Sequence, residues 1–288
     1  MLVLKHVAVG EVALFMRGNG ALELPTLLVL HGGPGWDHSY LLPALDDLAD
    51  VRRVVLLDLR GCGRSSRDLP GDAYQPDHCV ADAAGVVAAL GLSRVDVLGF
   101  SYGGQLAMLL AERHPDLVDR LVLASTTAYP DVEDDLGRIA EYRRREPAVS
   151  AGVAAALADP ALDDAGKTRA MAMAAAPMNV WDLGLLDDWR AVLGRVRFSG
   201  DWNAPWLAGR LRPPRPRDPE RVLRELGRRV LVLHGEHDLG FPVAVARRLH
   251  AAVPGSRLVV VPGAGHAAHF ERRAEWVGAV RGFLTAGG

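Results

Sequence analysis

The sequence predicts an α/β fold: a mostly parallel, eight-stranded sheet with helices on both faces and a helical cap insertion. Two observations carry this prediction. Short runs rich in Val and Leu alternate with helical patterns along most of the 288 residues, and one interval without strand character interrupts the alternation. Such alternation is typical of buried parallel strands joined by crossover helices. A chain of this length can form one such core together with a lid.

Eight strands are predicted in order along the chain. Residues 2–9 and 12–16 flank Gly10 and Glu11, a short turn that favours an antiparallel hairpin. The six remaining strands are expected at residues 26–31, 53–58, 95–100, 121–124, 230–234 and 258–261. Helical patterns lie between them at residues 41–48, 77–90, 102–114, 242–253 and 272–284. The central strands would therefore be buried under helices on both faces of the sheet.

Residues 129–216 break the alternation of strands and helices. They contain no convincing strand, and they hold four of the six tryptophans: Trp181, Trp189, Trp202 and Trp206. The interval ends in a stretch rich in Pro and Arg at residues 211–217, which is typical of a stiff, exposed connector. We therefore predict an α/β core over residues 1–128 and 217–288 and a helical cap over residues 129–216. The tryptophans would form the core of the cap or line a pocket beneath it.

Charge and composition exclude several classes of partner. The 33 Lys and Arg residues nearly balance the 35 Asp and Glu residues, so the sequence shows no basic surface for nucleic acid. No apolar run approaches the roughly 20 residues of a membrane span, and residues 1–10 lack the pattern of a secretory signal. Two cysteines, Cys62 and Cys79, are too few for a disulfide framework. We therefore expect a cytoplasmic protein without a nucleic-acid or membrane partner.

The strongest local signal is Gly99-Phe-Ser-Tyr-Gly103, which matches G-x-S-x-G and lies between a predicted strand and a predicted helix. Side chains next to a nucleophile on so sharp a turn would collide with neighbouring backbone, so glycine is needed on both sides. The turn would present the Ser101 hydroxyl at the positive end of a helix dipole, where developing negative charge is stabilised. Ser101 is therefore the predicted nucleophile, and a purely structural turn is the alternative.

A serine nucleophile needs a histidine to accept its proton and a carboxylate to orient that histidine. In the chain order Ser, acid, His, the base is expected to be His266, which follows the last predicted strand. His269, three residues further on, is the alternative base. Asp238, after the next-to-last strand, is the predicted acid. The alternative acids are Glu236 in the same turn and the cluster of Asp131, Glu133, Asp134 and Asp135.

Two backbone N–H groups are expected to stabilise an oxyanion beside Ser101. One belongs to Tyr102, the residue after the nucleophile, and the other to Gly33 in the glycine-rich loop at residues 31–36.

A metal site is disfavoured, because the spacing of its candidate ligands matches no closed zinc site. Those candidates are His234, His237, Asp238, His266 and His269. No metal or other cofactor is therefore expected. The histidines expected to be exposed or structural, away from the reacting edge of the sheet, are His6, His38, His78, His114 and His250.

Together these motifs resemble the α/β-hydrolase fold and, within it, the proline iminopeptidase group. The resemblance rests on HGGPG at residues 31–35, DLRGCGRS at residues 58–65, the Ser101 turn, Asp238 and the GAGH segment that ends at His266. It implies a serine aminopeptidase or amidase that acts on small N-terminal residues, with acidic cap groups holding the free amine of the substrate. Tyr102 stands where typical members of the group have Trp. No cap carboxylate matches the amine-binding positions, and this includes Asp182, Asp187 and Asp188.

Three hypotheses about function follow. The first is a metal-free serine hydrolase that attacks a small ester or amide carbonyl and forms an acyl-enzyme on Ser101. The second is a specialised pathway enzyme of the same fold that opens a lactone, acts on a C–C bond or catalyses a lyase step on a bulky apolar substrate, since the cap is rich in aromatic residues. The third is a non-catalytic ligand receptor, which the intact set of nucleophile, base and acid disfavours. Dehalogenase and epoxide-hydrolase chemistry is disfavoured too, because it places Asp at the turn.

Overall fold

The computed structural model describes residues 2–286, apart from the side chain of Arg228. These residues form one sheet of eight strands in the order β1-β2-β4-β3-β5-β6-β7-β8. β1 (Val3–Val9) and β2 (Val12–Asn19) form the predicted antiparallel hairpin, and β2 also pairs antiparallel with β4 (Arg53–Leu57). All other pairs are parallel, and they involve β3 (Thr26–Leu30), β5 (Val95–Phe100), β6 (Val118–Ala124), β7 (Val230–Gly235) and β8 (Arg257–Val261). The predicted fold class is confirmed.

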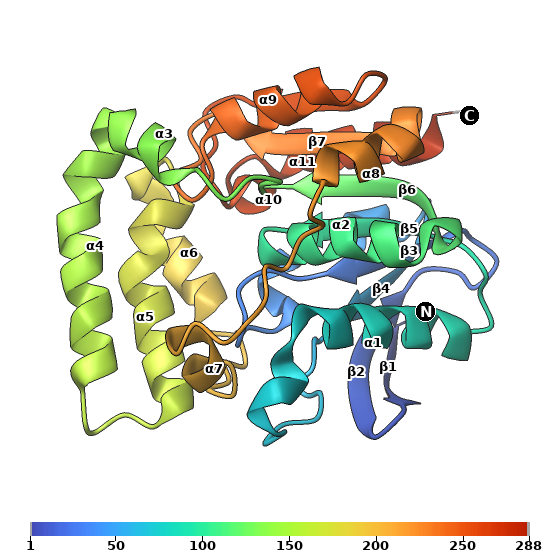
Figure 1. Ribbon diagram of the computed structural model, residues 1–288. Helices are drawn as coiled ribbons and strands as arrows, with labels where there is room; N and C mark the ends of the chain where they lie inside the picture. Colours follow the sequence, from blue (N-terminus) through green and yellow to red (C-terminus); the bar gives the residue numbers. More distant parts are fainter. Residues whose placement is uncertain (1, 287–288) are drawn as a thin grey trace.

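Helices cover both faces of the sheet (Figure 1). One face carries α1 (Pro76–Ala89), α2 (Tyr102–Arg113), α8 (Pro219–Leu226) and α9 (Val243–Ala252). The other carries α10 (Ala268–Glu271), α11 (Arg273–Thr285) and two 3-10 turns, η1 (His38–Leu41) and η2 (Asp46–Leu48). β5 shows why two cores result, since Val95 and Val97 face one core whereas Leu98 and Phe100 face the other. Successive strand residues point to opposite faces.

One local prediction is wrong, and one helix of the core lacks a prediction. The helix expected at residues 41–48 is instead η1 and η2, because Pro43 between them has no N–H to donate into a helix. The helix α8 was not predicted, although its start has a recognisable signal. Pro219 is its first residue, and the Asp218 side chain accepts a hydrogen bond from Arg221 N at 3.0 Å.

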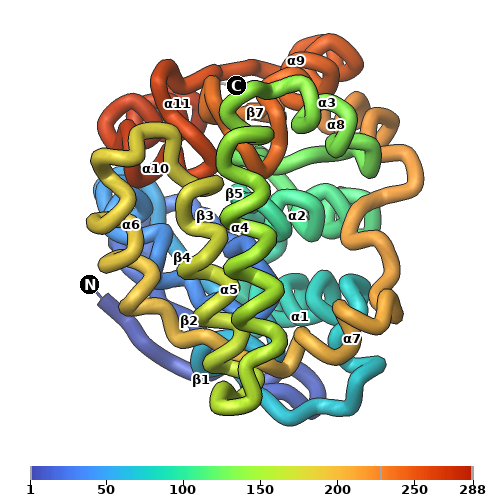
Figure 2. The backbone as a smooth tube through the Cα atoms, turned by 90° about the vertical axis from the view of Figure 1, so that its left-hand side faces the viewer, coloured from blue at the N-terminus to red at the C-terminus, as the bar shows by residue number. Residues whose placement is uncertain are grey.

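Residues 129–216 are helical wherever they have regular structure, as the sequence predicts. They form α3 (Glu133–Arg138), α4 (Ala140–Ala158), α5 (Asp164–Asn179), η5 (Leu183–Leu185), α6 (Leu186–Leu193) and α7 (Asn203–Leu207). In Figure 2, α4 and α5 cross in front of β3 and β5, beyond the ends of the strands. We keep the division into a core (1–128, 217–288) and a cap (129–216) as a proposal. Residues 1 and 287–288 of that core lie outside the described residues.

The end of the cap is bonded to the loops that follow β3 and β4. Arg197 N donates to the Asp37 carboxylate at 3.2 Å, and Ser199 N donates to Gly35 O at 2.8 Å. Asp201 accepts hydrogen bonds from the loop after β4, from Asp68 N and from the Tyr74 hydroxyl, each at 2.7 Å. The indole of Trp202 donates to Arg60 O at 2.9 Å. The cap is therefore held against the carboxyl edge of the sheet, where side chains from several parallel strands converge.

Candidate active site

Ser101 lies on a strained turn between β5 and α2. Its φ of 54° and ψ of −120° fall in a region that residues other than glycine rarely adopt. A Cβ on Gly103 would collide with the carbonyl oxygen of Leu30, and a Cβ on Gly99 would collide with that of Gly103. Neighbouring backbone holds the turn in place, since Ser101 N donates to Ala124 O at 2.9 Å. The tight turn and its need for flanking glycines are as the sequence predicts.

The structure brings His266 and Asp238 together. The two carboxylate oxygens of Asp238 lie 3.0 and 2.9 Å from His266 Nδ1. Asp238 is fully buried, whereas the edge of His266 remains accessible. Because Nδ1 is engaged by a carboxylate, it carries the hydrogen, and the lone pair of the neutral ring is on Nε2.

Hydrogen bonds fix the Asp238 carboxylate and keep it ionised. Oδ1 accepts from Gly240 N at 2.7 Å and from Phe241 N at 2.8 Å. Burial by itself would raise the pKa of Asp238, but the facing His266 outweighs it, helped by His234 and by the Phe241 N–H, so the pKa lies below its ordinary value. His234 Nε2 lies 3.3 Å from Oδ2 and donates to Phe241 O at 2.7 Å. Burial lowers the pKa of His234, which therefore remains neutral behind the carboxylate.

The alternative bases and acids lie elsewhere. His269 is buried, its Nε2 donates to Tyr40 O at 3.1 Å, and burial lowers its pKa to about 3. Glu236 is exposed and accepts from Gly263 N at 3.0 Å. In the second acidic cluster, Asp131 faces Arg248 at 3.3 Å on the surface. Among the described residues, Asp238 is the only carboxylate hydrogen-bonded to His266.

The loop after β3 lies directly against the nucleophile. A Cβ on Gly32 would come within 2.7 Å of Ser101 Cβ, and the Gly32 N–H is occupied, since it donates to the Tyr40 hydroxyl at 2.7 Å. Gly33 has a φ of +56° and lines the same cavity as Ser101. Tyr102 is the first residue of α2, so its N–H lies ahead of the hydrogen-bond ladder of the helix. Among the described contacts outside the helix, neither the Gly33 N–H nor the Tyr102 N–H has a hydrogen-bond acceptor.

A cavity of about 180 Å³ joins these residues. Its lining residues come from the loop after β3, the nucleophile turn, the cap and the His266 loop: Gly33, Trp36, Tyr40, Phe100, Ser101, Asn179, Trp189, His266 and Ala267. The described contacts include no hydrogen bond between Ser101 and His266; such bonds often form fully only when substrate is bound. A larger groove of about 680 Å³ runs along residues 212–220 and includes none of the predicted site residues.

Only one of the four cap tryptophans lines this cavity within the described part of the chain. That residue is Trp189, which is also fully buried in the cap. Trp181 stacks on His237 with ring centroids 4.0 Å apart, Trp202 packs against Tyr74 at the start of α7, and Trp206 is about half exposed. The remaining aromatic lining comes from Trp36, Tyr40 and Phe100, which the sequence analysis did not single out. These three residues lie near the glycine-rich loop or next to the nucleophile in the sequence, and that nearness is the feature from which their place in the cavity could have been predicted.

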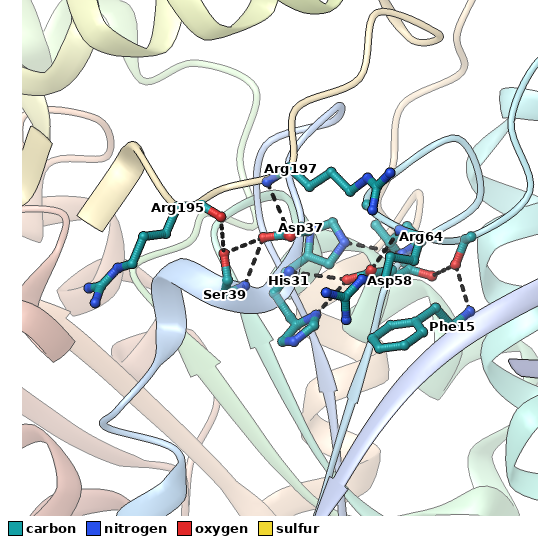
Figure 3. A network of polar contacts seen from close by, with 12 residues as sticks. Phe15, His31, Asp37, Ser39, Asp58, Arg64, Arg195 and Arg197 are labelled. Atoms are coloured by element: carbon teal, nitrogen blue, oxygen red, sulfur yellow. Dashed lines mark hydrogen bonds and ion pairs between the residues drawn. The ribbon is translucent and has the colours of Figure 1, made fainter. Parts of the chain in front are cut away.

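The sequence predicts that His38 lies away from the reacting edge of the sheet. This prediction is wrong. His38 is buried beside the end of β4, with its Nδ1 2.6 Å from the Asp58 carboxylate. Figure 3 shows Asp58 in the network of polar contacts around it, close to Arg64. Asp58 also accepts from Arg64 N at 2.9 Å, so it joins the loop after β3 to the loop after β4. This explains the Asp of the DLRGCGRS motif: its role is to support the loop that carries Gly33.

No helix among residues 2–286 combines the length and apolar character needed to cross a membrane. The same residues include no group of three or more His, Cys, Asp or Glu arranged to hold a metal ion.

Comparisons with known proteins identify the family to which the chain belongs. A family model described as alpha/beta hydrolase fold matches residues 25–273. A Bacillus subtilis (strain 168) protein with the provisional name 2-succinyl-6-hydroxy-2,4-cyclohexadiene-1-carboxylate synthase is 31% identical over 272 residues, which are 94% of this chain and 93% of that protein. A proline iminopeptidase of Lactobacillus delbrueckii subsp. bulgaricus is 29% identical over 292 residues, 94% of each chain. The crystal structure of a hydrolase from Pseudomonas aeruginosa PA01 is similar with a TM-score of 0.74, 26% identity and 98% coverage of each chain.

The fold, the nucleophile turn and the comparisons agree. The resemblance to the proline iminopeptidase group is confirmed, since a proline iminopeptidase aligns with almost the whole chain. The matches support hydrolase activity in general, and they differ among themselves in the reactions that their names state. The chain belongs to the α/β-hydrolase fold family.

Proposed function

We propose that this chain is a serine hydrolase that cleaves a small ester or amide, as a proline iminopeptidase-like aminopeptidase or amidase does, through an acyl-enzyme on Ser101. The observation that carries the proposal is the arrangement of Ser101 and His266 on one cavity, with the buried Asp238 carboxylate 2.9 Å from His266 Nδ1. Ser101, His266 and Asp238 come from three loops at one edge of the sheet, and this convergence supports a role in acyl transfer.

The proposed reaction uses each group in turn. His266 Nε2 takes the Ser101 hydroxyl proton while Oγ attacks the carbonyl carbon, and Asp238 stabilises the imidazolium. The carbonyl electron pair moves to oxygen, where the N–H groups of Gly33 and Tyr102 hold the oxyanion. His266 then protonates the leaving alcohol or amine, which departs and leaves the acyl group on Ser101. Water, deprotonated by His266, attacks the acyl-enzyme, releases the acid and restores the hydroxyl.

Removal of the nucleophile tests the proposal. In Ser101→Ala, hydrolysis of phenyl acetate should fall by about three orders of magnitude or more, and a fluorophosphonate probe that labels the wild-type chain should no longer react. Wild-type turnover in Ser101→Ala would overturn the serine mechanism. A wild-type chain that the probe does not label would instead favour the non-catalytic receptor.

A second candidate is the specialised pathway enzyme, acting as a lyase, a lactonase or on a C–C bond. The aromatic walls of the cavity and the synthase name of the Bacillus subtilis relative favour it. A panel of aminoacyl naphthylamides and simple phenyl esters separates the candidates. Rapid cleavage of aminoacyl naphthylamides supports the peptidase-like reaction, whereas slow turnover of the whole panel by a chain with a reactive Ser101 supports the second candidate.

We also propose that the chain is cytoplasmic, that its partner is a small-molecule substrate and that it binds no nucleic acid. Cys62 and Cys79 are buried and unpaired, as is usual in a reducing compartment. Fractionation of cells that produce the chain tests the location, and its appearance in an oxidising compartment would contradict it.

A further inference from the structure

The cavity beside Ser101 is small and has rigid walls. A cavity of about 150 Å³ can hold benzene, so the 180 Å³ here suit one compact ring together with the reacting carbonyl. Tyr40, Phe100 and Trp189 are each almost fully buried. Trp36 meets Tyr40 edge to face with ring centroids 5.2 Å apart, and Tyr40 meets Phe100 in the same way at 5.8 Å. Interlocked rings of this kind leave little room for the pocket to widen.

The described residues that line the cavity include no Asp, Glu, Lys or Arg. The cap carboxylates lie elsewhere. Asp187 is almost fully exposed, Asp188 is exposed, and Asp182 is exposed and accepts from Gly184 N at 2.9 Å. Asp238 is already bonded to His266 and two backbone N–H groups. A buried ammonium group needs a carboxylate partner to offset its loss of hydration, so the lining favours an uncharged substrate group.

Asn179 is a polar cap residue whose orientation is determined by its neighbour. Trp189 Nε1 donates to Asn179 Oδ1 at 3.1 Å. An indole N–H can only donate, so the amide oxygen must face Trp189 and the NH₂ group must face away from it. The Asn179 carbonyl accepts from Ala267 N at 2.7 Å, next to the proposed base. Among the described contacts Nδ2 has no hydrogen-bond partner, and Asn179 is one of the residues that line the aromatic cavity.

We infer that Asn179 determines substrate specificity by donating a hydrogen bond from Nδ2 to an acceptor oxygen on a compact, uncharged acyl group. A ring ether or a ring carbonyl oxygen has the required chemistry. A protonated ring amine does not, because its N–H groups would face the N–H groups of Asn179 without a carboxylate nearby. The inference rests on the proposed attack by Ser101 on an acyl group, and it narrows the proposed function to an esterase or amidase whose acyl group has no free ammonium, rather than an aminopeptidase.

Three phenyl esters that differ in one ring position test the inference. Their acids are tetrahydrofuran-2-carboxylic acid, cyclopentanecarboxylic acid and proline, which place an oxygen, a methylene group and a protonated nitrogen at the same position. For the wild-type chain, kcat/KM should be about tenfold higher for the oxygen ring than for the carbon ring, the usual effect of one hydrogen bond. Of the three phenyl esters, that of proline should have the lowest kcat/KM. Equal rates for the first two esters, or fastest cleavage of the prolyl ester, would overturn the inference.

Asn179→Asp provides the decisive variant because it keeps the shape of the side chain. One carboxylate oxygen can still accept from Trp189, whereas the other replaces the donor with a negative charge. The ratio of kcat/KM for the prolyl ester to that for the oxygen-ring ester should rise at least about tenfold. Asp188→Asn is the matched control on the exposed surface of the cap and should retain the wild-type ranking. An unchanged ranking in Asn179→Asp, or a changed one in Asp188→Asn, contradicts the role of Asn179.

Two further measurements keep the inference separate from the proposed function and from misfolding. Labelling by a fluorophosphonate probe reports whether Asn179→Asp is folded with a reactive Ser101. If Asn179→Asp is not labelled, Asn179→Ser replaces it and should lower the preference for the oxygen ring over the carbon ring. Undiminished hydrolysis of all three esters by Ser101→Ala would refute the proposed function. If Ser101→Ala loses hydrolysis and the wild-type chain cleaves the prolyl ester faster than the other two esters, only the inference is refuted.

Discussion

The surroundings of single side chains determine how each of them is charged. Asp238 and His269 are both buried, yet their pKa values are lowered for different reasons. Asp238 stays ionised because a histidine and backbone N–H groups stabilise its charge against burial. His269 stays neutral because burial dominates and its Nδ1 has no hydrogen-bond partner. Proximity in sequence is therefore a poor guide to function, since His266 and His269 differ in environment despite being three residues apart.

Asp238→Asn should lower kcat by about three to four orders of magnitude. Gly240 N and Phe241 N both donate to Oδ1, so the amide oxygen of the variant should remain there and its NH₂ group should face His266 Nδ1. Nδ1 must then accept, which puts the hydrogen on Nε2 and removes the base. Steady-state hydrolysis of a phenyl ester measures the effect. Glu236→Gln is the control, and activity of Asp238→Asn within tenfold of wild type would contradict the assignment of the acid.

His269 should make the stability of the fold sensitive to acid. Its folded pKa of about 3 lies below the ordinary 6.5, so the unfolded chain binds more protons between these values. The His269 contribution is fully present above pH 6.5 and decreases as the pH falls, by at most about 1.4 kcal/mol per pH unit. Urea unfolding between pH 7 and 4 should show a flatter pH dependence for His269→Phe than for the wild-type chain. Parallel curves for the two proteins would show that His269 titrates normally.

At the scale of elements, the short helix α10 joins the cap to the loop that carries His266. Glu271, at its end, accepts from Trp181 N at 2.8 Å and Asp182 N at 3.0 Å through Oε1, and from Gly265 N at 2.6 Å through Oε2. Gly265 directly precedes His266. One buried carboxylate therefore sets the position of the base relative to the cap.

Glu271→Ala should destabilise the fold by about 2–4 kcal/mol, because three N–H groups lose their acceptor. It should also lower kcat about tenfold to a hundredfold, since displacement of a catalytic loop is costly. Glu271→Gln retains one oxygen acceptor and should have an intermediate effect on both quantities. Urea unfolding and ester hydrolysis provide the measurements. A stable but fully active Glu271→Ala chain would show that the His266 loop is held by other contacts.

At the scale of the whole molecule, the cap is hydrogen-bonded to the core at several places, two of which concern the cavity. Residues 179–182 are bonded to α10 and the His266 loop, and residues 195–202 are bonded to the loops after β3 and β4. Both attachments lie next to the cavity. Shared hydrogen bonds of this kind couple the unfolding of the cap to that of the sheet.

We therefore expect one cooperative unfolding transition. In urea, tryptophan fluorescence, which reports largely on the cap, should change together with far-UV circular dichroism. Asp201→Ala removes the acceptor for Asp68 N and the Tyr74 hydroxyl, so it should lower the unfolding free energy by about 1–3 kcal/mol and shift both curves together. A fluorescence transition at clearly lower urea than the dichroism transition would show that the cap unfolds independently.

The fold could be predicted largely from short-range patterns. The strands come from runs of Val and Leu, and the turn at Ser101 comes from two glycines whose replacement would cause backbone collisions. These features depend on neighbours along the chain, so they can be read from it. The failures were local too: Pro43 divided an expected helix, and the Asp218 cap of α8 was overlooked.

The sequence by itself therefore determined the fold class, the candidate nucleophile and a short set of possible partners for it. Only the tertiary structure decided that Asp238 and not Glu236 contacts His266, that His38 supports the loop after β3, and that Asn179 lines the cavity. The physical reason is distance along the chain. Strand order and the path of the cap bring such groups together across tens to hundreds of residues, and hydrophobic periodicity, which repeats every two to four residues, contains no information about that pairing.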